Sequence, residues 1–395
     1  MLLPKNKKTI FNKKYLLISH TYTTGPSQEL RNFFIKNRVS FAFVENPFSY
    51  NQNQKRSKIS YYEKGKLVLS YQGVKINGSE VLYFIKDFFE TLILTIKIKR
   101  RFDICITANP LNTTAAWFLK KFGLIKKIVF WTIDYTPQRL EEKLLNNLYH
   151  SMDRFCCYHS DFLWNSSGRM RKARQKNGVD LKRCARETVV VDGCHFNDIK
   201  RFPDEKINRY KLVFMGHLIP NKGVDLILKA LPEVVKNYPK VSLKIIGTGP
   251  EENNLKKLAK ELKVDKRITF TGYIKDYKVV EKMIASCGIA IAPYVPDPNS
   301  FTFFSDVGKV KIYLACGLPV LITDVPEIAK EIAKNKAGLI FDYQPRSLVT
   351  KMGKLLSSSS FYSHCRKNAI QMAQNLDWDN VFNQVLKTTD KNLWN

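Results

Sequence analysis

The sequence predicts an α/β protein built from two Rossmann-like domains. At 395 residues, the chain exceeds the size at which one hydrophobic core usually stops growing. Short apolar segments alternate with longer amphipathic ones along most of that length, which is typical of parallel sheets covered by helices on both faces. We place the first domain at residues 1–195, the second at 205–375, and a C-terminal helix at 376–395.

In the first half, strand-like segments alternate with helical ones. The predicted strands are 15–19, 40–44, 104–108, 128–132, 154–158 and 188–191. The predicted helices are 28–37, 80–99, 113–121, 139–149 and 162–174. Polar residues predict a loop at 51–58, and a hairpin follows at 59–74, turning at 63–66. We interpret the irregular, charged segment 192–209 as the linker between the domains.

The second half repeats this alternation more clearly. Its predicted strands are 211–215, 242–246, 268–270, 289–292, 319–322 and 339–341. Its predicted helices are 223–237, 251–262, 277–285, 309–315, 327–332 and 347–356. The tail 361–391 is helical in pattern and is broken near 376–378.

The charge balance is strongly basic. There are 65 Lys and Arg residues against 35 Asp and Glu, a formal net charge of +30. Such a surface attracts polyanions, which include anionic lipid head groups, nucleic acid and phosphorylated substrates; the alternative is a Lys-rich composition without a functional meaning. The lysines are scattered and no nucleic-acid-binding motif is present, which disfavours nucleic acid as a partner.

The cysteine pattern and the apolar segments bear on location. The 8 cysteines form no CxxC pair and no cluster with zinc-ligand spacing, which favours a reducing compartment. Residues 1–14 do not resemble a signal peptide, so we expect a cytoplasmic protein. The segment 81–101 is too charged to span a bilayer, but it has the composition of a basic amphipathic helix. It is either a helix docked on an anionic membrane surface, at the cytoplasmic face, or a buried packing helix with a solvated end.

Ligands of open α/β sheets bind at the carboxyl ends of strands, and three loops of the second half qualify. Gly216–Gly223 follows a strand and ends at a helix start, so Gly216 would let a ligand approach the backbone and Lys222 would supply charge for a diphosphate. Gly247 and Gly249 form the turn after the next strand. Thr271, Gly272 and Tyr273 form a third turn, where the backbone could contact the edge of a nucleobase and Tyr273 could lie beside it. A solvated lysine and plain strand–helix turns are the alternatives at these positions.

A fourth region makes a family resemblance specific. The run from Lys309 to Val320 resembles the K-x-x-E-Y-x-A-x-G-x-P-V signature of GT-B glycosyltransferases, especially the retaining family 4. Residues 216–223 resemble that family's G-R-x-x-x-x-K-G donor-phosphate loop, and the two following turns occur in the same order. The pair Asp377–Trp378 resembles the tryptophan near the family's closing helix. The resemblance covers 211–386 and is loose in the first half.

The resemblance implies the GT-B architecture, with two Rossmann-like domains facing across a cleft and a C-terminal helix crossing back to the first domain. It also implies a glycosyltransferase that takes a nucleotide-diphosphate sugar as co-substrate, needs no further cofactor, and acts on a glycan or lipid-linked acceptor with retention. The implied donor-binding residues are Gly216, His217, Lys222, Gly247, Gly249, Thr271, Gly272, Tyr273, Ser305, Asp306 and Lys309.

The sequence departs from the family pattern at three positions. His217 replaces the arginine of the phosphate loop, and the family's Glu-x7-Glu pair aligns with Phe304 and Ile312. An apolar Ile312 cannot hydrogen-bond a ribose. Either Asp306 or backbone groups replace these contacts, or the donor binds differently, or the chain is a weakened or inactive homologue that binds a sugar nucleotide or glycan.

The chemistry of the expected reaction suggests roles for several residues. Lys222 and a protonated His217 would stabilise the leaving diphosphate without a metal ion. In the first domain, Asp134 follows a strand and would orient a hydroxyl; its alternative role is a helix N-cap. His20 and Gly25 lie in the 20–26 loop and are candidates for acceptor contact, with a structural histidine and a tight connection as alternatives.

Overall fold

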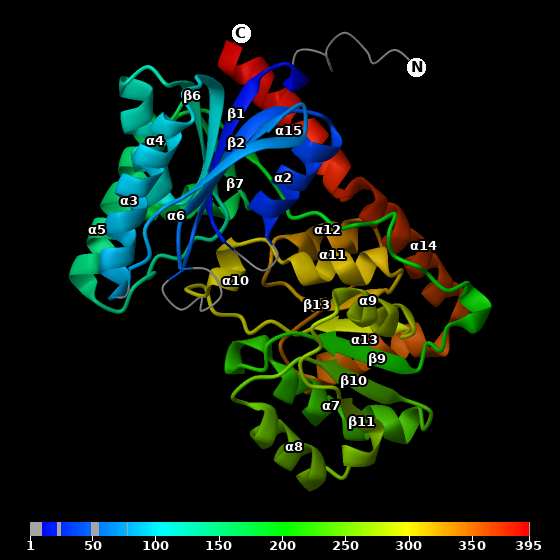
Figure 1. Cartoon of the computed structure of the whole chain (residues 1–395). Coiled ribbons are helices and arrows are strands. Elements are labelled where there is room, and N and C mark those ends of the chain that lie inside the picture. The colour runs from blue at the N-terminus through cyan, green and yellow to red at the C-terminus, as the bar shows by residue number, and fades with distance from the viewer. Residues whose placement is uncertain (1–9, 22–24, 49–54, 77, 395) are drawn as a thin grey trace, which may run out of the picture. The chain divides into compact units, whose positions relative to one another are not determined.

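The computed structural model describes residues 10–21, 25–48, 55–76 and 78–394, and it divides into two compact units (Figure 1). Unit 1 consists of Met1–Val191 and Trp378–Asn395, and unit 2 of Asp192–Asp377. The segment predicted as a linker belongs to unit 2, because its apolar residues Cys194, Phe196 and Ile199 are buried in the core of that unit. The chain passes between the units at 191/192 and again at 377/378.

Unit 1 is built on an eight-stranded sheet of order β4-β3-β2-β1-β5-β6-β7-β8. The strands are β1 Lys14–His20, β2 Ser40–Asn46, β3 Lys58–Glu63, β4 Lys66–Gln72, β5 Phe102–Ala108, β6 Ile125–Thr132, β7 Phe162–Asn165 and β8 Glu187–Val189. The pairings of β2 with β3 and of β3 with β4 are antiparallel, which confirms the predicted hairpin, and the other pairings are parallel.

Helices cover both faces of this sheet. They are α2 Pro26–Lys36, α3 Glu80–Lys97, α4 Pro110–Lys121, α5 Lys143–His159, α6 Arg169–Lys176 and α15 Trp378–Trp394. On one face, α2 and α15 pack on the core that contains Phe33 and Phe382; on the other, α3 and α4 pack on the core that contains Leu94 and Leu119. The C-terminal helix is thus part of unit 1, as the resemblance implied.

Two predicted elements of unit 1 are wrong. Residues 154–158 were predicted as a strand but lie in α5, and 162–165, predicted as the start of a helix, form β7. Both segments are short apolar runs, for which periodicity does not separate a strand from a buried helix turn. The sheet decides between them: β7 pairs with β6 through Val129–Phe162, whereas Cys156 and Cys157 pack against the sheet from α5.

Unit 2 has a six-stranded sheet of order β11-β10-β9-β12-β13-β14, with every pairing parallel. The strands are β9 Lys211–Met215, β10 Ser242–Ile246, β11 Ile268–Phe270, β12 Ile289–Ala292, β13 Val320–Thr323 and β14 Gly338–Phe341. Each corresponds to a predicted strand, because alternation in this half is not interrupted by insertions. The order reverses between β9 and β12, so the turn after β9 lies at the switch point where such sheets bind ligands.

The helices of unit 2 also lie on two faces. They are α7 Val224–Asn237, α8 Glu252–Glu261, α9 Tyr277–Ala285, α10 Phe301–Phe304, α11 Gly308–Ala315, α12 Ile328–Lys334, α13 Pro345–Ser357 and α14 Ser359–Asn375. One core contains residues of α7, α8 and α13, and the other residues of α9, α11, α12 and α14. Among the described residues of both units, no helix is long and apolar enough to cross a membrane.

Candidate donor-binding site

The turn after β9 has the geometry of an anion-binding loop. The chain leaves the strand at Met215, makes a short 3-10 turn at Pro220–Lys222, and enters α7 through Gly223. Gly223 has φ 65°, and a Cβ at this position would lie 2.0 Å from the backbone oxygen of Pro293. Only glycine fits both the left-handed conformation and the close approach, so the turn is fixed next to the N-terminus of α7.

Lys222 is held in a buried, mostly aromatic environment. Its side chain is 7% exposed, and its Nζ lies 3.4 Å from Thr302 Oγ1. The ammonium group lies 4.7 Å from the ring centroid of Phe301 and 5.4 Å from that of Tyr294, within the range of cation–π attraction. Burial lowers the pKa of Lys222 to about 8, because water no longer solvates the charge.

Lys309 brings a second ammonium group to the same turn. A Cβ built on Gly216 would lie 2.5 Å from Lys309 Nζ, so the absence of a side chain at Gly216 leaves the space that the ammonium occupies. The pKa of Lys309 is lowered to about 8, first by burial and then by the charge of Lys222. Within residues 10–21, 25–48, 55–76 and 78–394, neither ammonium forms an ion pair with a carboxylate.

Two neighbouring cations without a counter-ion define the chemistry that this turn can perform. Each would be stabilised by an anion, and the glycine-containing turn and the N-terminus of α7 add backbone N–H donors. The arrangement is therefore suited to a diphosphate group. Lys222 and Lys309 were both predicted from the sequence, and the structure brings them together with Gly216.

His217 lies at the exposed side of this turn. Its Nδ1 donates a hydrogen bond of 2.8 Å to the backbone oxygen of Thr248. Because a carbonyl oxygen only accepts, this bond places the hydrogen on Nδ1 and leaves Nε2 as the second polar atom of the ring. A protonated ring would add one more donor next to the two lysines.

The glycines of the second turn serve backbone packing. A Cβ on Gly247 would lie 2.0 Å from the backbone oxygen of Gly216, and one on Gly249 would lie 2.3 Å from that of Leu218. These contacts hold the first two turns against each other, which agrees with the structural alternative. At the third turn, Gly272 has φ 69° with open space where a Cβ would be, and Tyr273 is 71% exposed. Thr271 donates its hydroxyl to backbone oxygens.

Asp306, suggested as a replacement for the missing glutamates, has several partners within unit 2. Its carboxylate forms a buried ion pair with Lys311 and accepts hydrogen bonds from the backbone N–H groups of Val307 and, at 2.6 Å, of Asp192. These bonds fasten the start of unit 2 to α11, and contact of Asp306 with a donor ribose stays a prediction. Ser305 is buried, and its Oγ has no partner among the described residues.

The positions of the absent carboxylates are occupied by core residues. Phe304 is 7% exposed and Ile312 is 9% exposed, and Ile312 packs in the same core as Tyr313. Tyr313 fixes this helix to β9, because its hydroxyl accepts a hydrogen bond of 2.6 Å from the N–H of Met215. No carboxylate from α11 therefore reaches the turn after β9.

In unit 1, the structure buries His20. The side chain is 4% exposed, its ring stacks on Phe48, and its Nδ1 accepts a hydrogen bond of 2.8 Å from Asn109 Nδ2. Its Nε2 lies 3.7 Å from Asp87 Oδ2. These contacts favour the structural interpretation of His20 over contact with an acceptor.

The other two candidates of unit 1 remain at the carboxyl ends of strands. Gly25 occupies the N-cap position of α2 and its backbone oxygen accepts from Gln28 and Glu29; residues 22–24 of the predicted loop lie outside the described residues. Asp134 follows β6 and is partly exposed. It does not cap α5, which begins only at Lys143, so its alternative role as an N-cap is excluded.

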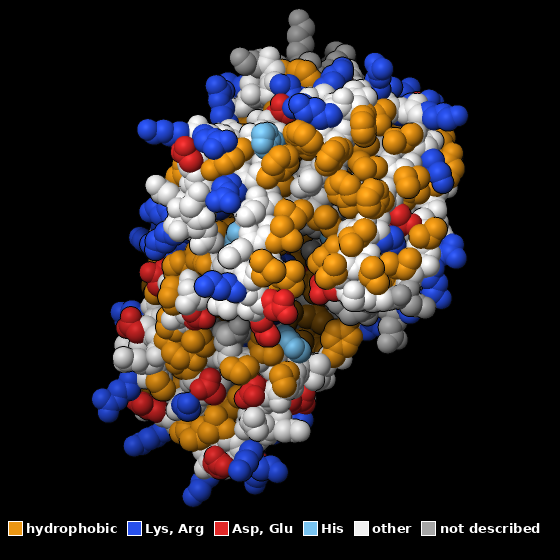
Figure 2. All heavy atoms as spheres, turned by 90° about the vertical axis from the view of Figure 1, so that its left-hand side faces the viewer, with side chains coloured by type: hydrophobic (Ala, Val, Ile, Leu, Met, Phe, Trp, Pro, Cys, Tyr) orange, Lys and Arg blue, Asp and Glu red, His pale blue; other side chains and the backbone are white. Residues whose placement is uncertain are grey.

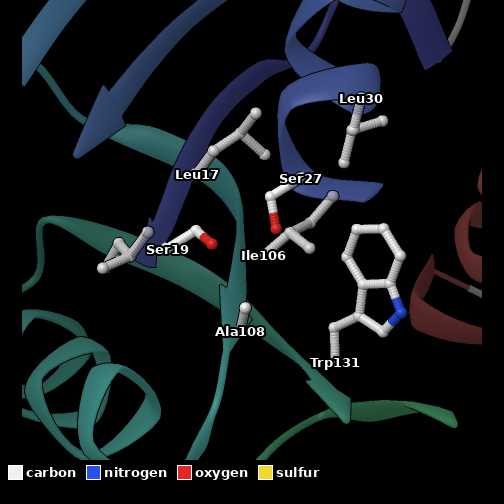
Figure 3. A pocket seen from close by; sticks show the side chains of 8 residues that line it. Leu17, Ser19, Ser27, Leu30, Ile106, Ala108 and Trp131 are labelled. Atoms are coloured by element: carbon white, nitrogen blue, oxygen red, sulfur yellow. The ribbon is translucent and has the colours of Figure 1, made fainter. Parts of the chain in front are cut away.

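A small pocket of unit 1 lies next to the 20–26 loop (Figure 3). Its lining comes from β1, α2, β5 and β6 and is mostly apolar, with the hydroxyl groups of Ser19 and Ser27 turned toward the space. The Oγ of Ser27 has no hydrogen-bond partner among the described residues. The pocket carries no charged side chain, so it does not compete with the turn after β9 as an anion site.

The sequence pointed to the long segment after β12 as functional but did not predict that it surrounds Lys222. Thr302 and the rings of Tyr294 and Phe301 come from the segment after β12. Thr302 lies 80 residues after Lys222 in the sequence. The unusual length of the 294–306 segment was the available signal, since long loops in compact domains are commonly functional. Which of its side chains face Lys222 depends on the fold.

Comparison with known proteins gives matches that lie mainly in the second half of the chain. Residues 196–372 match the family model described as glycosyl transferases group 1. The chain is 28% identical over 154 residues to a GDP-mannose-dependent alpha-(1-6)-phosphatidylinositol monomannoside mannosyltransferase of Mycolicibacterium smegmatis, covering 38% of this chain and 39% of that protein. It is 26% identical over 220 residues to D-inositol 3-phosphate glycosyltransferase 2 of Catenulispora acidiphila, covering 51% and 46%. The chain thus spans less than half the length of these curated relatives.

Solved structures extend the similarity of fold to both units. Sucrose-phosphate synthase of Thermosynechococcus elongatus superposes with a TM-score of 0.70 at 13% identity, over 96% of this chain and 99% of that one. The HepE protein of Anabaena in complex with UDP gives a TM-score of 0.68 at 14% identity, over 96% and 100%. The chain therefore has the GT-B fold of two Rossmann-like units, and the match to the glycosyl transferases group 1 model lies within its second unit, at residues 196–372.

Proposed function

We propose that this protein is a glycosyltransferase that binds a nucleotide-diphosphate sugar at the turn after β9. The observation that carries the proposal is the pair of neighbouring ammonium groups of Lys222 and Lys309, which have no carboxylate partner among the described residues. Charges held in this way are preorganised for a leaving group that gains negative charge. The family of residues 196–372 supports this assignment.

The proposed reaction breaks the bond between the sugar and the diphosphate. Positive charge develops on the sugar ring and negative charge on the departing diphosphate, so the two lysines stabilise the transition state more than the bound donor. His217 contributes a further donor when its ring is protonated. Since side chains neutralise the diphosphate, we propose that the reaction needs no metal ion, and from the family resemblance we propose retention of configuration.

The acceptor that we propose is a glycan or a lipid-linked glycan. Support comes from the names of similar proteins, which act on phosphatidylinositol monomannosides and on inositol phosphate. Asp134 is the candidate carboxylate for orienting an acceptor hydroxyl. We propose a cytoplasmic location for the reaction.

The test measures donor binding and turnover in the Lys222→Ala and Lys309→Met variants. Binding of UDP and GDP is followed by calorimetry, and transfer or hydrolysis is followed with UDP- and GDP-sugars. We expect each variant to lose roughly a hundredfold to a thousandfold in kcat/KM, because removing one preorganised donor costs about 3–4 kcal/mol of transition-state stabilisation. Lys236→Ala, an exposed lysine near the end of α7, is the matched control and should behave as the unchanged protein.

Wild-type affinity and turnover in both lysine variants would refute the proposed site. The same measurements also test the alternative function, that of an inactive homologue that binds a nucleotide or glycan. The apolar residues Phe304 and Ile312 at the positions of the family's glutamates favour this alternative. It predicts that Lys222→Ala weakens nucleotide binding while no donor sugar is transferred or hydrolysed by the unchanged protein.

A further inference from the structure

Three helices of unit 1 expose a continuous set of large apolar side chains, here called the α3–α5 apolar face. Each of these eleven side chains is more than a third exposed. They are Val81, Leu82, Ile85, Phe89, Ile93 and Ile96 of α3, Phe118 of α4, Phe122 directly after it, and Leu144, Leu145 and Leu148 of α5. Figure 2 looks onto the side where these helices lie and shows hydrophobic side chains gathered there.

Folding of unit 1 does not account for this face. Helix α3 already packs a separate set of residues, including Leu94, against the sheet. The buried side of α3 also holds an ion-paired group, Lys86 with Asp87 and Glu90, so the larger apolar stripe of this helix is the exposed one. The face continues from α3 to α4, because Phe88 contacts Phe89 and, with ring centroids 5.7 Å apart, Phe118. Exposed apolar patches of this extent mark interaction sites.

A cluster of cations adjoins this face. Lys97 ends α3, and Lys99, Arg100 and Arg101 follow directly; all four are exposed. None of the four forms an ion pair within the part of the chain that the structure describes. Asp103, two residues after Arg101, forms an ion pair with Lys126, and the exposed carboxylates Glu80, Glu141 and Glu142 lie at the N-terminal ends of α3 and α5.

We propose that the α3–α5 apolar face docks on an anionic lipid bilayer. The apolar side chains enter the boundary between head groups and acyl chains, while the cations at the end of α3 contact anionic head groups. This combination is how amphipathic basic helices lie in a membrane interface, and the formal net charge of +30 adds long-range attraction to such a surface.

Charge complementarity selects the bilayer over a second copy of the chain. A symmetric dimer through this face would bring together two chains that each carry a formal net charge of +30, and with parallel α3 helices it would also bring the two clusters of four cations together. Like charges placed together oppose such an association, whereas an anionic lipid surface neutralises them. The sequence left open whether 81–101 docks on a membrane or packs in the core; the structure shows one face of α3 packed and the other exposed.

The test is flotation of the full chain with vesicles of equimolar phosphatidylglycerol and phosphatidylcholine, compared with pure phosphatidylcholine. We expect binding to the anionic vesicles only, and its loss at about 1 M salt, where the screening length is about 3 Å. Two variants separate the contributions. Ile85→Ser/Phe89→Ser/Ile93→Ser removes the centre of the apolar face, and Lys97→Gln/Lys99→Gln/Arg100→Gln/Arg101→Gln removes the cations.

We expect each variant to weaken binding by at least about tenfold, since one basic residue near an anionic surface contributes roughly fivefold to partitioning. The matched controls change equally exposed residues elsewhere: Val68→Ser/Val189→Ser/Val279→Ser for the apolar set, and Lys236→Gln/Lys240→Gln/Lys266→Gln/Arg267→Gln for the charges. Both controls should retain binding. Circular dichroism and thermal melting establish that every variant folds, as substitutions at exposed positions should allow.

Three results would overturn the proposal. The first is failure of the unchanged protein to bind anionic vesicles at low salt. The second is equal binding of the triple serine variant and its control to anionic vesicles, which would show that the apolar face does not contribute and that the attraction is purely electrostatic. The third is a dimer in light scattering that the triple serine variant converts to a monomer, which would assign the face to self-association. None of these results depends on donor binding, so the proposed function is tested separately.

Discussion

At the scale of single residues, Lys222 and Lys309 are the most unusual groups of unit 2. A buried lysine ordinarily has a carboxylate partner, as Lys311 has in Asp306. Lys222 and Lys309 instead have aromatic, hydroxyl and glycine neighbours, and the pKa of each is lowered to about 8. Their charge is therefore costly without a ligand, and an anionic ligand relieves that cost.

The lowered pKa values predict how nucleotide binding depends on pH. Because the pKa of each lysine lies near 8 rather than at its ordinary 10.5, the charged form is lost as the pH rises through about 8. We expect the affinity for UDP or GDP to be near its maximum at pH 7, where both lysines are mostly charged. Above pH 8 it should fall by up to about tenfold per lysine for each pH unit. Calorimetry between pH 7 and 9 measures this dependence.

The corresponding nucleoside is the control for that measurement, because it lacks the diphosphate but shares any ionisation of the base. Lys222→Arg is the second control, since a guanidinium stays charged over this range and should flatten the pH dependence. A nucleotide affinity that does not change between pH 7 and 9 would contradict the assigned role of the two ammonium groups.

At the scale of elements, a buried ion pair holds α5 and α6 to the sheet of unit 1. Arg174 of α6 donates two hydrogen bonds to Asp153 of α5, at 2.8 and 2.7 Å. It also donates to Asn165 at the end of β7 and to Thr132 at the end of β6. The guanidinium thus satisfies four acceptor atoms from three elements, α5, β6 and β7.

Removing this guanidinium should be strongly destabilising. We expect Arg174→Ala to lower the free energy of unfolding by about 3–5 kcal/mol, because Asp153 would remain buried without its partner. Arg174→Lys should restore little of this loss, since an ammonium cannot form the two parallel bonds. Urea denaturation followed by circular dichroism gives the values.

The matched control is Arg171→Ala, on the same helix. Arg171 forms an ion pair with Glu187 at the surface, at 2.8 Å, and such pairs contribute at most about 1 kcal/mol. If Arg171→Ala cost as much as Arg174→Ala, burial of the Asp153 pair would not be the source of the stability.

At the scale of the whole molecule, the last helix belongs to the unit in which the chain begins. Phe382, Val385 and Leu386 of α15 lie in the core of unit 1, together with residues of α2 and of the sheet. The indole Nε1 of Trp164 donates a hydrogen bond of 2.7 Å to Thr389 Oγ1. The chain thus passes from unit 1 to unit 2 at 191/192 and returns to unit 1 at 377/378.

Ending the chain after Asp377 should destabilise unit 1 selectively. The truncation exposes the apolar face that α15 covers, so we expect the thermal transition of unit 1 to move to lower temperature or disappear while that of unit 2 remains. Differential scanning calorimetry, with nucleotide added to identify the transition of unit 2, makes the comparison. Thr389→Val is a milder variant that should cost about 1–3 kcal/mol, by leaving the Trp164 N–H without a partner.

Equal effects of the truncation on both transitions would contradict the assignment of α15 to unit 1. A point variant as destabilising as the truncation would mean that the single hydrogen bond, rather than the packed helix, holds this face.

Sequence reasoning succeeded where local pattern and turn chemistry suffice. The six strands of unit 2, the glycine-containing turn and the lysines at 222 and 309 were predicted because each depends on a few consecutive residues. It failed at 154–158 and 162–165, where two apolar runs compete for one place in the sheet. It also did not predict the ion pair of Asp306 with Lys311, because that partner depends on the packing of α11.

By itself, the sequence determined the alternation of strands and helices, the excess of positive charge and the glycine and lysine residues of the turn after β9. These properties follow from residue type and spacing along the chain. Only the tertiary structure decided that Lys309 lies against Gly216, that His20 and Asp306 are occupied by protein partners, and that one side of α3 is left uncovered. The physical reason is that burial and pairing depend on groups distant in the sequence, which meet only when the sheets have formed.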